Sequence, residues 1–260
     1  MEDAHRPRRE IASVAYPDVN VALQGRESEV MADTHGHEIE LPEKPFDLIQ
    51  ELSRFRNMRD EVIPADFTRV MDKATAELIQ SKVADQVVGV GSEAPGFSLP
   101  NATGQQVTLS QMLTRGPVVI SFYPGVWCPF CNLEQRARQQ HLPQISELGA
   151  SLVAISGQTP DNSLSMAEKN SLTYEVLSDV GLTVASSYGL VFRLPDYLQE
   201  AYEQLGHPIP MFNGPGQQTL PIPATFVIAR DGIVRFAYAN PDYTHRADPQ
   251  DILATLKSIA

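Results

Sequence analysis

A buried strand, a turn and a helix that meet at two cysteines constrain the fold of this 260-residue chain more than any other feature. Residues 118–122 read Val-Val-Ile-Ser-Phe, a short apolar and β-branched run that is typical of a buried strand. A turn with proline and glycine follows, and the next helix is expected to begin at or near Cys128. The sequence therefore predicts that the cysteines lie where a buried strand gives way to a helix.

The spacing of the cysteines favours redox chemistry. Cys128 and Cys131 are the two cysteines of the chain and lie three positions apart. The free amides and the positive dipole end of a helix N-terminus stabilise a thiolate, so thiols placed there react at neutral pH. Two cysteines cannot supply the four ligands of a zinc site, and a secreted disulfide scaffold carries several, widely spaced. We therefore predict that one thiol attacks and the other closes a disulfide, rather than that both are merely small buried side chains.

Strands and helices alternate through the rest of the core. Further strands are expected at 152–155, 176–177, 225–228 and 233–236, and further helices at 133–148, 163–170, 181–188 and 249–260. The last two strands are joined by Arg-Asp-Gly, a hairpin turn, and Asp248 caps the last helix. This order predicts a mixed α/β sheet that helices cover on both faces.

Two segments extend this core. Residues 1–44 have no sustained periodicity and are expected to form a mobile arm. Residues 45–86 contain two series of apolar residues at helical spacing, called apolar stripes below, and these predict an N-terminal helical hairpin. Each stripe must pack on the core or on a second subunit, so a homodimer is one expectation. The core domain is assigned to residues 87–260. An insertion at about 190–222 is either a lid or interface, or a tolerated surface excursion.

Composition and charge argue against several classes of function. The net charge of −12 argues against nucleic acid as the main partner, because a polyanion needs a basic face. No segment approaches the ~18 consecutive apolar residues of a membrane helix. The first ten residues are polar, include acidic side chains and lead into no apolar stretch, which argues against a secretory signal or a transit peptide. Because no phosphate-binding loop, flavin motif or metal cluster is apparent either, we predict a cytoplasmic protein that uses no metal or cofactor.

The cysteine segment resembles the thioredoxin superfamily, and within it the peroxiredoxin-like branch of the alkyl hydroperoxide reductase and thiol-specific antioxidant family. That family has a strand ending Phe-Tyr-Pro, then Pro-x-x-x-Thr-x-x-Cys and a glutamate three residues later; here Pro124 is the proline and Glu134 the glutamate. Cys131 stands at the peroxidatic cysteine and Cys128 at the threonine. The resemblance runs from about residue 90 to 260, and the family's entry motif is matched by Gly91, Ala94, Pro95, Phe97 and Leu99. The Trp-Cys-Pro-Phe-Cys motif is similar to one subgroup especially.

The resemblance implies a thioredoxin-like fold of peroxiredoxin type and a thiol-dependent peroxidase. In this hypothesis the Cys131 thiolate attacks the peroxide, Cys128 resolves the sulfenic acid to an intramolecular disulfide, and Pro124 shields the sulfur from water. The family places an arginine before the strand at 225–228, where this chain has Pro223, and Arg246 is the candidate for the remaining cation. Pro223 itself resembles the superfamily's cis-proline, which faces the cysteines.

Other side chains near the motif are candidates for contact with the substrate. Trp127 and Phe130 would wall the pocket and favour an organic hydroperoxide, although plain packing explains them equally well. The remaining candidates are Tyr123, Glu134 and Pro223. The expected substrates are hydrogen peroxide or organic hydroperoxides, and the expected reductant is a thiol of the thioredoxin or glutathione type.

Two other functions fit the same cysteines. In a thioredoxin-like disulfide oxidoreductase, Cys128 lies nearer the helix start and attacks, and Cys131 resolves; the missing family arginine favours this hypothesis. In a redox-sensing binding protein, the disulfide state would control a partner that docks on the arm or the insertion. Peroxide turnover with a recycling donor separates the three.

Overall fold

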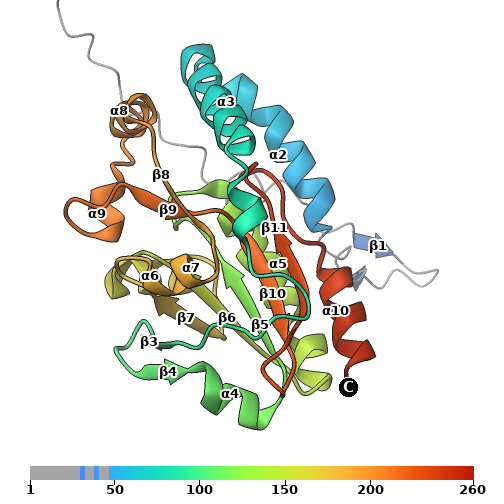
Figure 1. Ribbon diagram of the computed structural model, residues 1–260. Coiled ribbons are helices and arrows are strands. Elements are labelled where there is room, and N and C mark those ends of the chain that lie inside the picture. Colours follow the sequence, from blue (N-terminus) through green and yellow to red (C-terminus); the bar gives the residue numbers. More distant parts are fainter. Residues whose placement is uncertain (1–29, 33–37, 41–46) are drawn as a thin grey trace, which may run out of the picture.

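A computed structural model describes residues 30–32, 38–40 and 47–260 (Figure 1). Most of the arm expected at 1–44 lies outside these residues. Its described part forms two short antiparallel strands, β1 (Val30–Ala32) and β2 (Glu38–Glu40), which the sequence did not indicate.

A five-stranded mixed sheet in the order β11-β10-β5-β6-β7 forms the centre of the molecule. Strands β5 (Val118–Phe122), β6 (Ser151–Ser156) and β7 (Glu175–Ser178) are parallel. Strands β10 (Ala224–Ile228) and β11 (Val234–Ala239) form an antiparallel hairpin, and β10 pairs antiparallel with β5. This sheet confirms the predicted thioredoxin-like α/β fold, and it makes β5 the central strand.

Strand β5 is buried on both faces, and four of its five side chains are apolar. Val118, Ile120 and Phe122 enter the core on one side of the sheet, and Val119 and the following Tyr123 enter the core on the other. The second side is covered by α5 (Pro129–Glu147), α6 (Pro160–Lys169) and α10 (Pro249–Ser258). The first side is covered by η1 (Val83–Gln86), β3 (Ser98–Pro100), β4 (Gln106–Thr108), α4 (Leu109–Arg115) and α7 (Thr183–Ser187). Among the described helices, none combines the length and the apolar character that a membrane span requires.

The N-terminal stripes form helices α2 (Leu48–Val62) and α3 (Ala65–Gln80), which lie beside each other outside the sheet (Figure 1). Leu48, Leu52 and Phe55 of α2 join the core cluster that includes the inner face of α5. Met71 and Ala74 of α3 pack instead on the insertion. The apolar side chains of both helices therefore pack against other parts of the same chain.

The insertion leaves the core as β8 (Val191–Arg193) and returns as β9 (Thr219–Pro221), and these two strands pair antiparallel. Between them lie α8 (Asp196–Gln204) and α9 (Ile209–Asn213). Leu194 and Leu198 pack against α3 in a small cluster of their own. The insertion thus reaches across to the N-terminal hairpin instead of lying loose on the surface.

Replacing Phe55 by alanine is expected to lower the free energy of unfolding by about 3–5 kcal/mol. The Phe55 ring is 4% exposed and packs edge-on against Phe130, with 5.1 Å between ring centroids. Ile49 is a control on the same helix because it is 45% exposed, so Ile49→Ala should change stability by no more than about 0.5 kcal/mol. Urea unfolding of both variants measures the difference, and equal losses would contradict the docking of α2 on α5.

Candidate active site

Cys128 is the N-cap residue of α5, directly after the loop that follows β5. Pro129 takes the first helical position, where its missing N–H costs no hydrogen bond. The Cys128 carbonyl accepts from the backbone amides of Cys131 (3.1 Å) and Asn132 (3.2 Å) and so begins the helix. The Asn132 side chain donates to the carbonyls of Val126 (2.7 Å) and Cys128 (2.8 Å), which ties the loop to the helix. Both cysteines are thereby held on the first turn of α5.

A group of buried charges lies behind the cysteines. The Nη2 of Arg246, from the segment between β11 and α10, is 3.4 Å from Sγ of Cys131, and its Nε donates to Oε2 of Glu134 at 2.7 Å. The other Glu134 oxygen, Oε1, is 3.3 Å from Nη2 of Arg138. All four side chains are buried. Two guanidinium groups facing one carboxylate leave one positive charge, which a single thiolate on the cysteine pair can compensate.

The two thiols differ in pKa. Burial disfavours the Cys128 thiolate, but a hydrogen bond from Cys131, the charge of Arg246 and the first amides of α5 outweigh it and lower the Cys128 pKa to about 7. Burial raises the pKa of Cys131, the neighbouring Cys128 thiolate raises it further, and Arg246 offsets only part of this. The pair therefore begins to lose its first proton near neutral pH, and Cys128 is the thiol with the lowered pKa.

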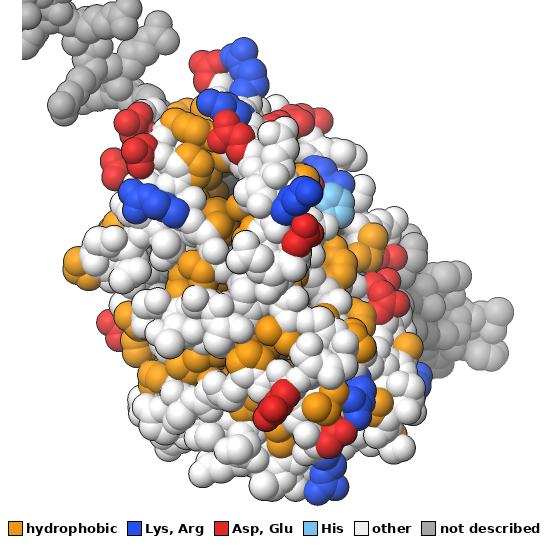
Figure 2. Space-filling model, viewed as in Figure 1, with side chains coloured by type: hydrophobic (Ala, Val, Ile, Leu, Met, Phe, Trp, Pro, Cys, Tyr) orange, Lys and Arg blue, Asp and Glu red, His pale blue; other side chains and the backbone are white. Residues whose placement is uncertain are grey.

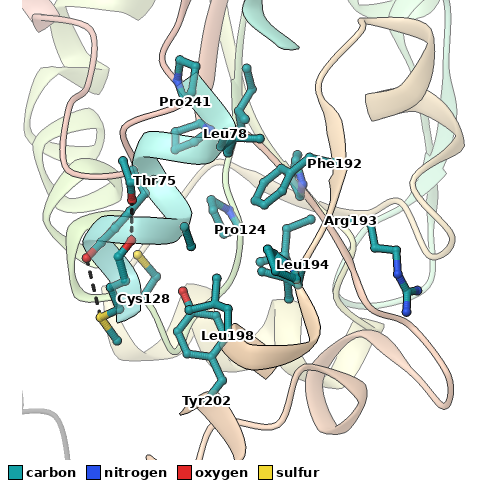
Figure 3. A pocket seen from close by; sticks show the side chains of 18 of the residues that line it. Thr75, Leu78, Pro124, Cys128, Phe192, Arg193, Leu194, Leu198, Tyr202 and Pro241 are labelled. Carbon is teal, nitrogen blue, oxygen red and sulfur yellow. Dashed lines mark hydrogen bonds between the residues drawn. The ribbon is translucent and has the colours of Figure 1, made fainter. Parts of the chain in front are cut away.

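An apolar pocket of about 230 Å³ opens in front of Cys128 (Figure 3). One wall comes from α3 and includes Met71, Ala74, Thr75 and Leu78. The opposite wall comes from the insertion and includes Phe192, Leu194, Leu198 and Tyr202. Figure 2 shows hydrophobic side chains gathered around a hollow between α8 and α3, with charged side chains outside it. Cys128 lines this pocket and is 3% exposed, whereas Cys131 is fully buried and does not line it.

The candidate residues fall into two groups. Those that line the pocket are Pro124, Trp127, Cys128 and Pro223. Those that lie in the buried charged group are Cys131, Glu134 and Arg246. The structure therefore brings Arg246 from far along the chain to the cysteines, at the place where the sequence analysis looked for a remaining cation.

Other candidates lie away from the pocket. Phe130 does not wall it, because its ring packs between Phe55 and Tyr243, with centroid distances of 5.1 and 5.5 Å. Tyr123 is fully buried, and neither it nor Glu134 lines the pocket. The expected cis-proline is also wrong, since none of the described peptide bonds is cis and the bond before Pro223 is trans.

Several residues that shape the site were not predicted from the sequence. Arg138 lies four positions after Glu134 on the same helix, a spacing that could have indicated an ion pair. Tyr243 lines the pocket, and its backbone carbonyl accepts a hydrogen bond from Arg246 Nη1. No pattern in the sequence links Ala74 or the rest of α3 to cysteines about fifty positions away.

Comparisons with known proteins identify a matching family and related sequences. Residues 90–237 match the model of the AhpC/TSA family. The chain is 30% identical over 154 residues to the chloroplastic peroxiredoxin Q of Suaeda salsa, covering 59% of this chain and 61% of that protein. It is 29% identical over 150 residues to the chloroplastic peroxiredoxin Q of Sedum lineare, covering 58% and 68%. The match to the first relative thus spans less than two thirds of that protein's length.

A solved structure resembles the core. The crystal structure of peroxidoxin BcpB from Mycobacterium tuberculosis superposes with a TM-score of 0.52 at 28% identity, covering 66% of this chain and 97% of that one. The matched family segment begins after α3, so the N-terminal hairpin lies outside it.

The expected cytoplasmic location is contradicted by the comparisons. The peroxiredoxin Q proteins of Suaeda salsa and Sedum lineare are both chloroplastic by name. The composition of the first ten residues was therefore an insufficient basis for assigning a compartment.

Proposed function

This chain belongs to the AhpC/TSA family, and on that premise we propose that it is a thiol-dependent peroxidase acting through Cys128 and Cys131. The observation that carries the proposal is a cysteine pair placed to hold a thiolate: the buried Arg246 lies 3.4 Å from Sγ of Cys131, and Cys128 lines a pocket. A peroxidase needs such a thiolate because the thiolate, not the thiol, is the nucleophile. The proposed substrates are hydrogen peroxide and organic hydroperoxides.

We propose that Cys128 attacks first, which is the reverse of the order that the family motif implies. Cys128 lines the pocket and has the lowered pKa, whereas Cys131 is fully buried and has the raised pKa. A peroxide that enters the pocket therefore meets the Cys128 sulfur. Cys131 lies one helical turn further in and serves as the resolving thiol.

The chemistry balances with two thiols and one peroxide. The Cys128 thiolate attacks one peroxide oxygen, the O–O bond breaks, and the sulfur becomes a sulfenic acid while the alcohol or water leaves. The departing oxyanion needs a proton, and the Cys131 thiol, which is hydrogen-bonded to Cys128, can supply it. The resulting Cys131 thiolate displaces hydroxide from the sulfenic acid and forms the disulfide. An external thiol of the thioredoxin or glutathione type then returns two electrons.

The surrounding residues have supporting roles in this proposal. Arg246 stabilises negative charge on the cysteine pair and on the departing oxygen. Pro124 and Pro223 flank Cys128 at the pocket and limit the access of water to it. The expected homodimer stays a prediction, and it gains no support from the stripes of α2 and α3, which pack within the chain.

A disulfide oxidoreductase is the second candidate function. It is favoured by one observation, namely that the first cysteine of the pair is the one with the lowered pKa at the pocket. In that case the Cys128 thiolate attacks a disulfide sulfur and forms a mixed disulfide, which Cys131 resolves.

Stoichiometric peroxide is expected to produce an intramolecular Cys128–Cys131 disulfide. Mass spectrometry of the treated protein should show a loss of two hydrogens within the single peptide that holds both cysteines. Continuous peroxide consumption should then follow when a thioredoxin-type reductant is added. Inter-chain crosslinks alone would contradict the mechanism. Reduction of a disulfide substrate without peroxide consumption would support the oxidoreductase, and reactivity toward neither would point to a redox sensor.

A further inference from the structure

We propose that helix α3 is the specificity-determining wall of the peroxide site. Together with the insertion it closes an apolar compartment for the organic group of a hydroperoxide, with room for an aryl or a branched alkyl group. This inference rests on the proposed peroxidase function and adds to it the residues that select the substrate. These residues lie on an element outside the segment that matches the family.

The geometry of the pocket supports this role for α3. Ala74 and Leu78 lie one turn apart on α3 and both line the pocket. Leu78 lies on the other side of the pocket from Leu198 of α8 (Figure 3). Met71 and Ala74 of α3 also belong to a packed cluster with apolar side chains of the insertion. The position of the wall is therefore fixed by packing, and the compartment is preformed.

The size and chemistry of the compartment indicate the ligand. Its volume is about 230 Å³. A dry apolar cavity of about 150 Å³ is already large enough to bind benzene. The two charged residues among its lining are Glu77 and Arg193, and the Arg193 side chain points away from the cavity (Figure 3). Hydrogen peroxide has no apolar group to bury there, so the compartment favours a hydroperoxide that has one.

One end of this compartment is the reactive sulfur. Cys128 and Pro124 both line the pocket, and Pro124 lies between the α3 wall and the insertion (Figure 3). An organic group held against Ala74 and Leu198 would direct its hydroperoxide toward Cys128. Such positioning accelerates the first step because it holds the reacting atoms together.

Two alanines of α3 provide a matched test. Ala74 is buried and lines the pocket, whereas Ala76 on the same helix is exposed and does not. Ala74→Phe fills the compartment, and Ala76→Phe adds the same ring on the solvent side. Leu78→Ser is a milder second variant, since Leu78 is half-buried and its loss makes the wall polar without overfilling it.

Ligand binding can be followed without any turnover. Trp127 is the single tryptophan of the chain and lines the pocket, so its fluorescence reports on occupancy. The probe is 2-phenylpropan-2-ol, the alcohol that corresponds to cumene hydroperoxide. Its Kd is expected to rise ~10-fold or more in Ala74→Phe and several-fold in Leu78→Ser, within the range that small changes in an apolar pocket produce. Ala76→Phe should bind like the unmodified protein.

Steady-state kinetics then distinguish a failure of this inference about α3 from a failure of the proposed peroxidase function. The ratio of kcat/KM for cumene hydroperoxide to that for hydrogen peroxide should fall ~10-fold or more in Ala74→Phe and stay unchanged in Ala76→Phe. Unchanged alcohol binding and an unchanged ratio in both Ala74→Phe and Leu78→Ser would overturn the role of α3. Failure of the unmodified protein to consume either peroxide would instead count against the peroxidase, and the alcohol titration would still measure the pocket.

Discussion

Cys128→Ser is expected to lose the first peroxide reduction by several orders of magnitude, whereas Cys131→Ser is expected to retain it for one turnover. The reason is that Cys128 faces the pocket and is the thiol of the pair with the lowered pKa. In Cys131→Ser the serine hydroxyl can still donate a hydrogen bond to the Cys128 thiolate. That variant should consume about one equivalent of peroxide and then stop, because no resolving thiol remains.

A dimedone-type reagent identifies the oxidised sulfur. In peroxide-treated Cys131→Ser the adduct should appear on Cys128, and Cys128→Ser should give little adduct. Cys128→Ser is the stricter test of which sulfur attacks first, because its serine places a hydroxyl at the position where the family motif has threonine. Rapid peroxide consumption by Cys128→Ser, with the adduct on Cys131, would reverse our assignment and favour the order that the motif position implies.

The core and the position of the cysteines could be predicted because local signals decide them. The apolar run at 118–122 is buried on both faces of a sheet, and such a strand has few alternatives. Cys128 precedes Pro129, and proline is favoured at the first position of a helix, so the start of this helix could also be predicted. Arg246 was selected by resemblance, and the structure places it beside Cys131.

The pocket could not be predicted because it depends on contacts between distant segments. Phe130 was expected in its wall, but its position on the first turn of α5 directs the ring toward Phe55 of α2. Ala74 has no chemical feature that marks a binding residue, and it lines the site only because α3 packs against the insertion. The order of the two sulfurs escaped prediction for a similar reason, since burial by the whole fold decides which thiol meets the substrate.

Arg246→Met and Glu134→Gln are expected to move the pKa of the cysteine pair in opposite directions. Arg246 favours the thiolate by its positive charge, and its removal leaves Glu134 and Arg138 as a neutral pair. The first pKa should then rise from about 7, so the thiolate and the rate of peroxide reduction at neutral pH both fall. The charge of Glu134 raises the pKa of Cys131, so its neutralisation should lower the pKa of the cysteine pair and keep a thiolate populated at more acidic pH.

Both variants should also lose stability, which makes the opposite pKa shifts informative. Removing one member of a buried charge group lowers the free energy of unfolding by about 3–5 kcal/mol, because Glu134 loses its 2.7 Å contact in Arg246→Met and both guanidinium groups lose their carboxylate in Glu134→Gln. A merely structural defect would expose the cysteines in both variants and change their reactivity in the same direction. The rate of iodoacetamide alkylation against pH measures the first pKa of the pair, and urea unfolding measures the stability. Opposite shifts in the alkylation midpoint with similar losses of stability would show that Arg246 and Glu134 act on the thiolate through their charge, and midpoints that move together would exclude it.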